Sequence, residues 1–138
     1  GIRIASKFSE QKVENRKQQM QGDHSYKKLL VWEKAVAISI DVYRLTKKFP
    51  RDEQFALTSQ MRRAAVSIPA NIAEGYGRHT RKEFAHFLSI SRGSLTELET
   101  LLTIAKKLSY CTETECSTIE RQLDETGRML YALRASLH

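Results

Sequence analysis

Apolar residues recur every three or four positions through most of this chain, the spacing that collects them on one side of an α-helix. In the C-terminal stretch the repeat consists of Cys116, Ile119, Leu123, Thr126, Leu130, Leu133 and Leu137. In the stretch before it, the repeat consists of Phe84, Leu88, Ser91, Leu95, Leu98, Leu102 and Ala105. The alternation of apolar and polar residues that is typical of a β-strand is nearly absent. The pattern therefore predicts an all-α protein.

Turn and capping residues divide this pattern into four helices. Pro50 ends the first helix, and Asp52 suits the N-cap of the second, which ends at a turn containing glycine. Capping boxes that begin at Thr80 and Thr112 open the third and fourth helices. The expected helices cover residues 26–48, 52–76, 80–109 and 112–137. Short turns between four helices favour an antiparallel, up-down-up-down four-helix bundle.

The bundle domain is expected to occupy residues 26–138. Residues 1–25 are rich in Gln, Lys, Glu and Ser and have no convincing apolar stripe, so we expect a flexible N-terminal segment or an addition foreign to the native protein. Within the second helix, Pro69 cannot donate the hydrogen bond that Ala65 would accept. We expect a kink there, at a local cost of about 3 kcal/mol.

Four segments occur in an order that identifies a family. They are VWEKA and YRLTKKFP in the first helix, QMRRAAVSIPANIAEG in the second and FLSISRGSLTELETLLTIAKKLSY in the third. From Trp32 to Tyr110 the chain resembles the small four-helix proteins encoded by intervening sequences of bacterial 23S rRNA genes, relatives of the accessory proteins of diversity-generating retroelements. The resemblance implies a bundle that assembles as a ring of five, with nucleic acid as the usual suspected partner. Ser109 departs from it by replacing the expected helix-ending glycine, and residues 1–25 match nothing in the family.

The first helix carries two apolar stripes on nearly opposite sides. One consists of Val31, Ala35, Ile38, Val42, Leu45 and Phe49, and the other of Leu29, Trp32, Val36, Ile40 and Tyr43. Because one bundle core uses one stripe, the second indicates either self-association or a helix that its own chain envelops. We expect a ring-like homo-oligomer, most plausibly a pentamer. Its predicted interface residues are Trp32, Val36, Ile40 and Tyr43.

The formal net charge of +7 is concentrated at the two ends of the expected bundle. One basic cluster consists of Lys47, Lys48, Arg51, Lys106 and Lys107, and the other of Lys27, Lys28, Arg78, Arg81 and Lys82. The second cluster includes a turn immediately before a helix N-terminus, whose free backbone donors favour anions. The charge predicts RNA or DNA binding with little dependence on sequence, through Arg78, Arg81, Lys82, Lys47, Lys48 and Arg51. The alternatives are a solvated surface that keeps the protein soluble, and a helical scaffold that docks a protein partner such as a nucleic-acid enzyme.

Arg62 and Arg63 point about 100° apart on the second helix and cannot serve one role. Partly buried arginines require carboxylates, for which Glu74 and Glu97 are candidates, with Glu99 also available. We expect structural ion pairs that fix helix register and subunit orientation.

Catalytic and metal-binding patterns are missing from the sequence. His79, Glu83 and His86 have a metal-like spacing, but His79 precedes the capping threonine and is expected to lie off the helix. Cys111 and Cys116 lack a second cysteine pair and are expected to stay reduced. We therefore expect a protein that is not an enzyme and has no cofactor or metal. Since no run of about 18 apolar residues exists, we expect a soluble, cytoplasmic protein with no membrane contact.

Overall fold

The computed structural model describes residues 25–138 and contains four α-helices in this part of the chain. They are α2 (Leu30–Thr46), α3 (Leu57–Tyr76), α4 (Arg81–Lys107) and α5 (Glu113–Ala135), with the short 3₁₀ turns η1 (Ser25–Lys28) and η2 (Arg51–Glu53). No strand occurs in the described residues, so the prediction of an all-α protein with four helices is confirmed. The prediction for residues 1–25 lies outside the described range, except for its last residue.

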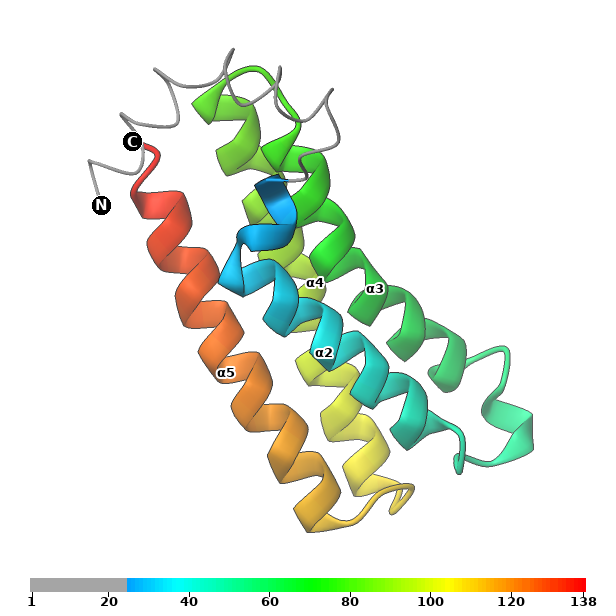
Figure 1. Ribbon diagram of the computed structural model, residues 1–138. Helices are drawn as coiled ribbons and strands as arrows, with labels where there is room; N and C mark the ends of the chain where they lie inside the picture. The colour runs from blue at the N-terminus through cyan, green and yellow to red at the C-terminus, as the bar shows by residue number, and fades with distance from the viewer. Residues whose placement is uncertain (1–24) are drawn as a thin grey trace.

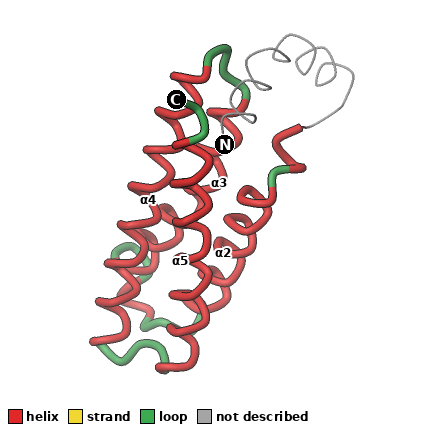
Figure 2. The backbone as a smooth tube through the Cα atoms, turned by 90° about the vertical axis from the view of Figure 1, so that its left-hand side faces the viewer, coloured by secondary structure: helices red, strands yellow, loops and turns green. Residues whose placement is uncertain are grey.

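Successive helices run in opposite directions around one core (Figure 1). The most extensive helix pair is α3 with α4, and α2 packs against both α3 and α5. The view turned by 90° shows the four helices lying along one long axis (Figure 2). This topology brings the C-terminal end of α5 to the same end of the bundle as the α3–α4 loop and the start of α4.

The apolar stripes predicted from the sequence form the core. The first stripe of α2, from Val31 to Phe49, is buried throughout, and the stripes of α4 and α5 are buried except for Leu133, which is half-buried. Helices α3 and α4 pack closely at Gly75, where an added Cβ would lie 2.7 Å from Cβ of Phe87. A side chain at position 75 would therefore push the two helices apart.

The predicted start of the second helix is wrong. Asp52 lies in η2 and does not cap a helix; α3 begins at Leu57, after Ala56, which makes no side-chain cap hydrogen bond. The physical reason is the carboxylate of Glu53. It accepts hydrogen bonds from the Leu57 backbone nitrogen at 3.4 Å and from the Tyr110 hydroxyl at 2.7 Å, which ties this turn to the α4–α5 loop. The first helix is likewise shorter than predicted, because a 3₁₀ turn precedes Leu30.

The proline in α3 does not interrupt the helix. Its effect is compensated by the neighbouring helix, because the Ser39 hydroxyl of α2 donates to the Ala65 carbonyl at 2.9 Å, the group that residue 69 leaves without its helical donor. From the other side, the Ser91 hydroxyl of α4 donates to the Ile68 carbonyl, also at 2.9 Å. The α3 backbone around Pro69 is therefore held by hydroxyl groups from two adjacent helices.

Candidate nucleic-acid interface

The end of the bundle that contains the α3–α4 loop carries the predicted anion-binding turn. Thr80 caps α4, since its hydroxyl oxygen accepts a hydrogen bond from the Glu83 backbone nitrogen at 3.1 Å. The same hydroxyl donates to the Glu83 carboxylate, also at 3.1 Å. Arg81 and Lys82 follow directly in the first turn of α4. The capping residue predicted from the sequence is therefore confirmed, and it places two basic side chains beside a helix N-terminus.

Between the start of α4 and the end of α5 lies a cavity of about 430 Å³. Its polar lining consists of Arg81, Lys82, His86, Ser89, Arg134 and His138. We call it the cationic pocket. The side chains of Ala85 and Leu137 complete the wall, and no Asp or Glu side chain of the described residues lines it. The pocket therefore gathers three permanent positive charges from two helices in one concave site.

Arg134 is held in place within this pocket. Its Nε donates to the Ser89 hydroxyl at 2.6 Å, and that hydroxyl donates to the Ala85 carbonyl at 3.2 Å. Sequence reasoning missed Arg134. The signal was available, because in an antiparallel bundle the last turn of the fourth helix lies beside the first turn of the third helix, so a basic residue there joins the same cluster.

Arg78 does not lie in the cationic pocket with Arg81 and Lys82, the two residues with which it shares the predicted anion-binding turn. Its guanidinium pairs with Glu74 at 3.3 Å and lies 4.8 Å from the centre of the Phe87 ring. Its Nε is buried and has no hydrogen-bond partner among the described residues. Arg78 thus packs the α3–α4 corner, whereas Arg81 and Lys82 line the cationic pocket.

The opposite basic cluster is partly neutralised by the acidic start of α5. Lys48 pairs with Glu115, and Lys106 pairs with Glu113 at 2.8 Å and with Glu120 at 3.7 Å. The hydrogen bond to Glu113 raises the pKa of Lys106 above its usual value. The side chains of the remaining members of this cluster are exposed: Lys47, Arg51 and Lys107. The two ends of the bundle are therefore not equivalent sites for an anion.

The predicted ion pairs of Arg62 and Arg63 do not form within the described chain. Arg62 donates from Nε to the Thr46 hydroxyl at 2.8 Å, and its guanidinium lies 4.6 Å from the centre of the Tyr43 ring. Arg63 donates to the Ser59 hydroxyl at 3.2 Å. As described above, Glu74 pairs with the arginine four residues along, and the Glu97 side chain is exposed. The C-terminal end of α2 therefore supplies the contacts of Arg62. The Thr46 hydroxyl and the face of the Tyr43 ring take the place of the expected carboxylate.

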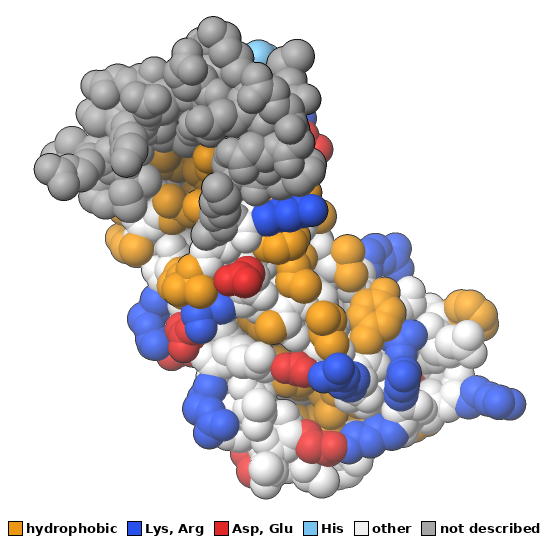
Figure 3. Space-filling view, in the orientation of Figure 1, with side chains coloured by type: hydrophobic (Ala, Val, Ile, Leu, Met, Phe, Trp, Pro, Cys, Tyr) orange, Lys and Arg blue, Asp and Glu red, His pale blue; other side chains and the backbone are white. Residues whose placement is uncertain are grey.

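The second stripe of α2 is only partly covered. Trp32 and Val36 are half-buried, whereas Ile40 and Tyr43 are 46% and 43% exposed. Hydrophobic side chains gather on this face of the molecule between basic ones (Figure 3). Phe55, which is 90% exposed, lines one cavity together with Tyr43. The described part of the chain therefore does not envelop α2 completely.

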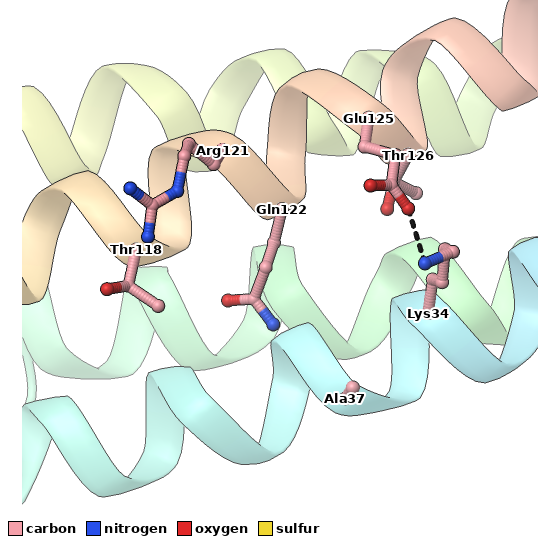
Figure 4. Close-up of a pocket in the computed structure, with 7 residues that line it drawn as sticks. All are labelled: Lys34, Ala37, Thr118, Arg121, Gln122, Glu125 and Thr126. Atoms are coloured by element: carbon pink, nitrogen blue, oxygen red, sulfur yellow. Dashed lines mark ion pairs between the residues drawn. The ribbon is translucent and has the colours of Figure 1, made fainter.

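A groove between α2 and α5 is the remaining candidate near this face (Figure 4). Its cavity measures about 410 Å³, and Lys34 forms an ion pair across it with Glu125. Gln122 donates to Asp41 at 3.0 Å. Because charges of both signs already pair here, the groove has no preference for an anion.

The described residues contain no group of three or more His, Cys, Asp and Glu side chains that could hold a metal ion. Cys111 and Cys116 are both free and buried. The pKa of the Cys116 thiol is raised to about 12. Burial is the larger cause, and the hydrogen bond with the neighbouring Cys111 is the second, so the thiolate is scarcely populated at neutral pH. No helix in the described part of the chain is long and apolar enough to span a bilayer.

These features define a small helical-bundle protein with one strongly basic end. The chain belongs to the family of 23S rRNA-intervening sequence proteins, whose sequence model matches residues 27–132. A similar solved structure is a protein of unknown function from the S23 ribosomal protein family of Bacteroides thetaiotaomicron. That structure has a TM-score of 0.69 and 22% sequence identity, and the match covers 76% of this chain and 98% of that one. No curated protein matches the chain.

Proposed function

We propose that this protein is a non-enzymatic, cytoplasmic helical protein that binds RNA or DNA with little dependence on sequence. The observation that supports this proposal is the cationic pocket, where Arg81, Lys82 and Arg134 meet and the described lining contains no Asp or Glu side chain. Phosphate oxygens are the natural ligands of such a cluster, and contacts to the phosphate backbone do not read bases. The family name, which refers to an intervening sequence of 23S rRNA, agrees with a nucleic-acid context.

The proposed active form is a homo-oligomer, a ring of five. The half-exposed stripe of α2, which consists of Trp32, Val36, Ile40 and Tyr43, supplies its interface. A single basic end of this size binds a phosphate backbone weakly. Repetition around a ring raises the effective concentration of the other copies once one copy has bound, so useful affinity comes from several pockets acting together.

Charge reversal at the cationic pocket tests the binding site. The double variant Arg81→Glu, Lys82→Glu is expected to lose more than about tenfold in affinity for a generic single-stranded oligonucleotide, because two phosphate contacts become repulsive. Parent affinity should also fall steeply between about 50 and 200 mM salt, as counterion release requires. Fluorescence anisotropy of a labelled strand measures both effects.

The matched control is the same reversal at the other end of the bundle, in the double variant Lys47→Glu, Arg51→Glu. The change in net charge is identical, because each variant replaces two basic residues by glutamates. Lys47 and Arg51 are exposed and form no ion pair among the described residues, so the control breaks no such contact. This control should retain most of the affinity of the parent protein. Equal binding by the pocket variant and the parent protein at the same salt concentration would contradict the proposed site.

A helical scaffold for a protein partner is the alternative function. Exposed apolar side chains on α4 and α5 favour it: Tyr131 is 60% exposed, Ile104 43% and Ile90 39%. A nucleic-acid enzyme is a suitable partner, in keeping with the resemblance to accessory proteins of diversity-generating retroelements. An apolar interface of this kind should respond little to salt, whereas nucleic-acid binding should respond strongly. The salt dependence therefore separates the two functions.

A further inference from the structure

The shape of the cationic pocket bears on the kind of phosphate that it accepts. Its lining comes from the first turns of α4 and the last turn of α5, and it encloses about 430 Å³ as a concave site at the end of the bundle. A phosphodiester inside a strand continues on both sides and carries one negative charge. A terminal phosphomonoester has three free oxygens, carries between one and two negative charges at neutral pH, and continues on one side only. A concave site suits the terminal group.

The hydrogen bonds around Arg134 leave part of its donor set available. Ser89 takes only the Nε donor, and the Ser89 hydroxyl is itself oriented by the Ala85 carbonyl. The two terminal nitrogens of a guanidinium can then bind two oxygens of one phosphate. Arg81, Lys82 and Arg134 form no ion pair with a carboxylate in the described part of the chain.

Three other cavities in the described structure lack this combination. The groove between α2 and α5 has the carboxylate of Glu125 in its wall. A second cavity between α4 and α5, distinct from the cationic pocket, is lined by the carboxylates of Glu99 and Asp124. The cavity beside Phe55 contains Arg62, whose Nε is bound to a threonine and whose guanidinium lies over a tyrosine ring. Among these four cavities, the cationic pocket is therefore the one where a terminal phosphate finds several cations that have no carboxylate partner among the described residues.

We propose that the cationic pocket binds the terminal phosphomonoester of a nucleic-acid strand, at either its 5′ or its 3′ end. The inference rests on the proposed nucleic-acid binding and adds the part of the strand that the pocket holds. Arg134 contacts the terminal phosphate, and Ser89 positions Arg134. Arg81 and Lys82 contribute to both end binding and general affinity, because they line the same site and lie on the first turn of α4.

The test compares oligonucleotides of one sequence and one internal fluorophore that carry a 5′-phosphate, a 3′-phosphate or hydroxyl groups at both ends. The parent protein should bind a phosphorylated strand about tenfold more tightly than the hydroxyl-ended strand, the effect of one charge-assisted contact. Arg134→Gln should remove most of this preference: the affinity for the phosphorylated strands should fall about tenfold further than the affinity for the hydroxyl-ended strand, which itself weakens because the pocket loses one of its three cations. Ser89→Ala should reduce the preference in the same direction, because the guanidinium loses its anchor.

Arg128→Gln is the matched control, because it makes the same change on the same helix at an exposed residue that pairs with Asp124 outside the pocket. It should keep the full preference for a phosphorylated end. Circular dichroism confirms that each variant retains its helices. Competition with inorganic phosphate separates a strand end from free phosphate, since a strand-end site should need far more of the free anion to release the bound strand.

Each outcome decides between the two proposals. Equal, salt-sensitive binding of all three strands by the parent protein would overturn end recognition and leave general nucleic-acid binding in place. A preference that survives Arg134→Gln would place end recognition outside this pocket. Release of the phosphorylated strand by low concentrations of inorganic phosphate would make free phosphate the ligand. Absence of binding to every strand would remove both proposals.

Discussion

At the scale of single residues, Ser109 is the position where backbone conformation and side chain disagree. Its φ of 63° lies in the left-handed region. The conformation ends α4 in the usual way, because Ser109 donates from its backbone nitrogen to Lys106 and Tyr110 donates to Ala105, both at 3.0 Å. Glycine adopts this conformation without the contact between Cβ and the backbone that disfavours it in other residues.

Ser109→Gly is therefore expected to stabilise the protein by about 0.5 to 1 kcal/mol. This net gain is the backbone strain that glycine relieves, reduced by the greater conformational entropy that glycine gives the unfolded chain. Urea denaturation followed by circular dichroism measures the change in the free energy of unfolding. Ser109→Ala is the control, because it removes the hydroxyl and keeps the Cβ, and it should give no gain. A gain from alanine as large as that from glycine would show that the hydroxyl, and not the backbone conformation, is unfavourable.

At this scale the sequence was informative where one residue acts alone. The absence of glycine at the end of the third predicted helix pointed directly to Ser109, and the threonine caps of α4 and α5 were confirmed. Asp52 failed as a cap because a neighbouring side chain, Glu53, binds both the helix start and Tyr110, which lies far along the chain. A contact over that sequence distance leaves no local pattern to detect.

At the scale of helices, the hydroxyl groups around Pro69 link three elements. Because Ser39 supplies the hydrogen bond that Ala65 lacks, Ser39→Ala should leave that carbonyl without a donor and destabilise the protein by about 1 to 2 kcal/mol. Pro69→Ala restores a backbone donor to the same carbonyl. The cost of Ser39→Ala should therefore be clearly smaller when residue 69 is alanine, and a double-mutant cycle on unfolding free energies measures this coupling.

The control for this cycle is Thr96→Ala, since the Thr96 hydroxyl donates only to a carbonyl one turn earlier in its own helix and is exposed. Its effect on stability should be small and independent of residue 69. Equal costs of Ser39→Ala in the two backgrounds would mean that the serine does not compensate for the proline. The spacing of turn and apolar residues predicted that a helix exists here. The hydrogen bond that compensates for Pro69 depends on which α2 residue faces the proline, and sequence spacing alone does not determine that.

At the scale of the whole molecule, topology explains which site residues could be predicted. The antiparallel order placed Arg81 and Lys82 at one end, and the same reasoning extends to Arg134 at the end of the last helix. Arg78 does not line the cationic pocket with them, because it packs on the ring of Phe87, a contact that depends on the angle at which two helices meet. The partial neutralisation of the opposite end comes from the acidic first turn of α5. The basic cluster was defined from lysines and arginines alone, so the glutamates that these lysines meet in space were left out of it.

The last prediction concerns assembly. Light scattering should give a particle mass that is a multiple of the 15.9 kDa chain, most plausibly five times that mass. Ile40→Glu should dissociate it, because a charge would enter the apolar stripe of α2 at a side chain that is 46% exposed in the single chain and that can be changed without opening the core. Ile104→Glu is the matched control on α4, where the side chain is 43% exposed, and it should remain assembled.

Dissociation should also weaken nucleic-acid binding, although Ile40 is not part of the lining of the cationic pocket. If several pockets act together, the Ile40→Glu chain should bind a long strand at least about a hundredfold more weakly than the parent, and a short strand that reaches one pocket about equally well. Anisotropy with strands of two lengths measures this difference. A parent protein that is monomeric at micromolar concentration would rule out the assembly, and equal loss for both strand lengths would show that Ile40→Glu damages the pocket itself.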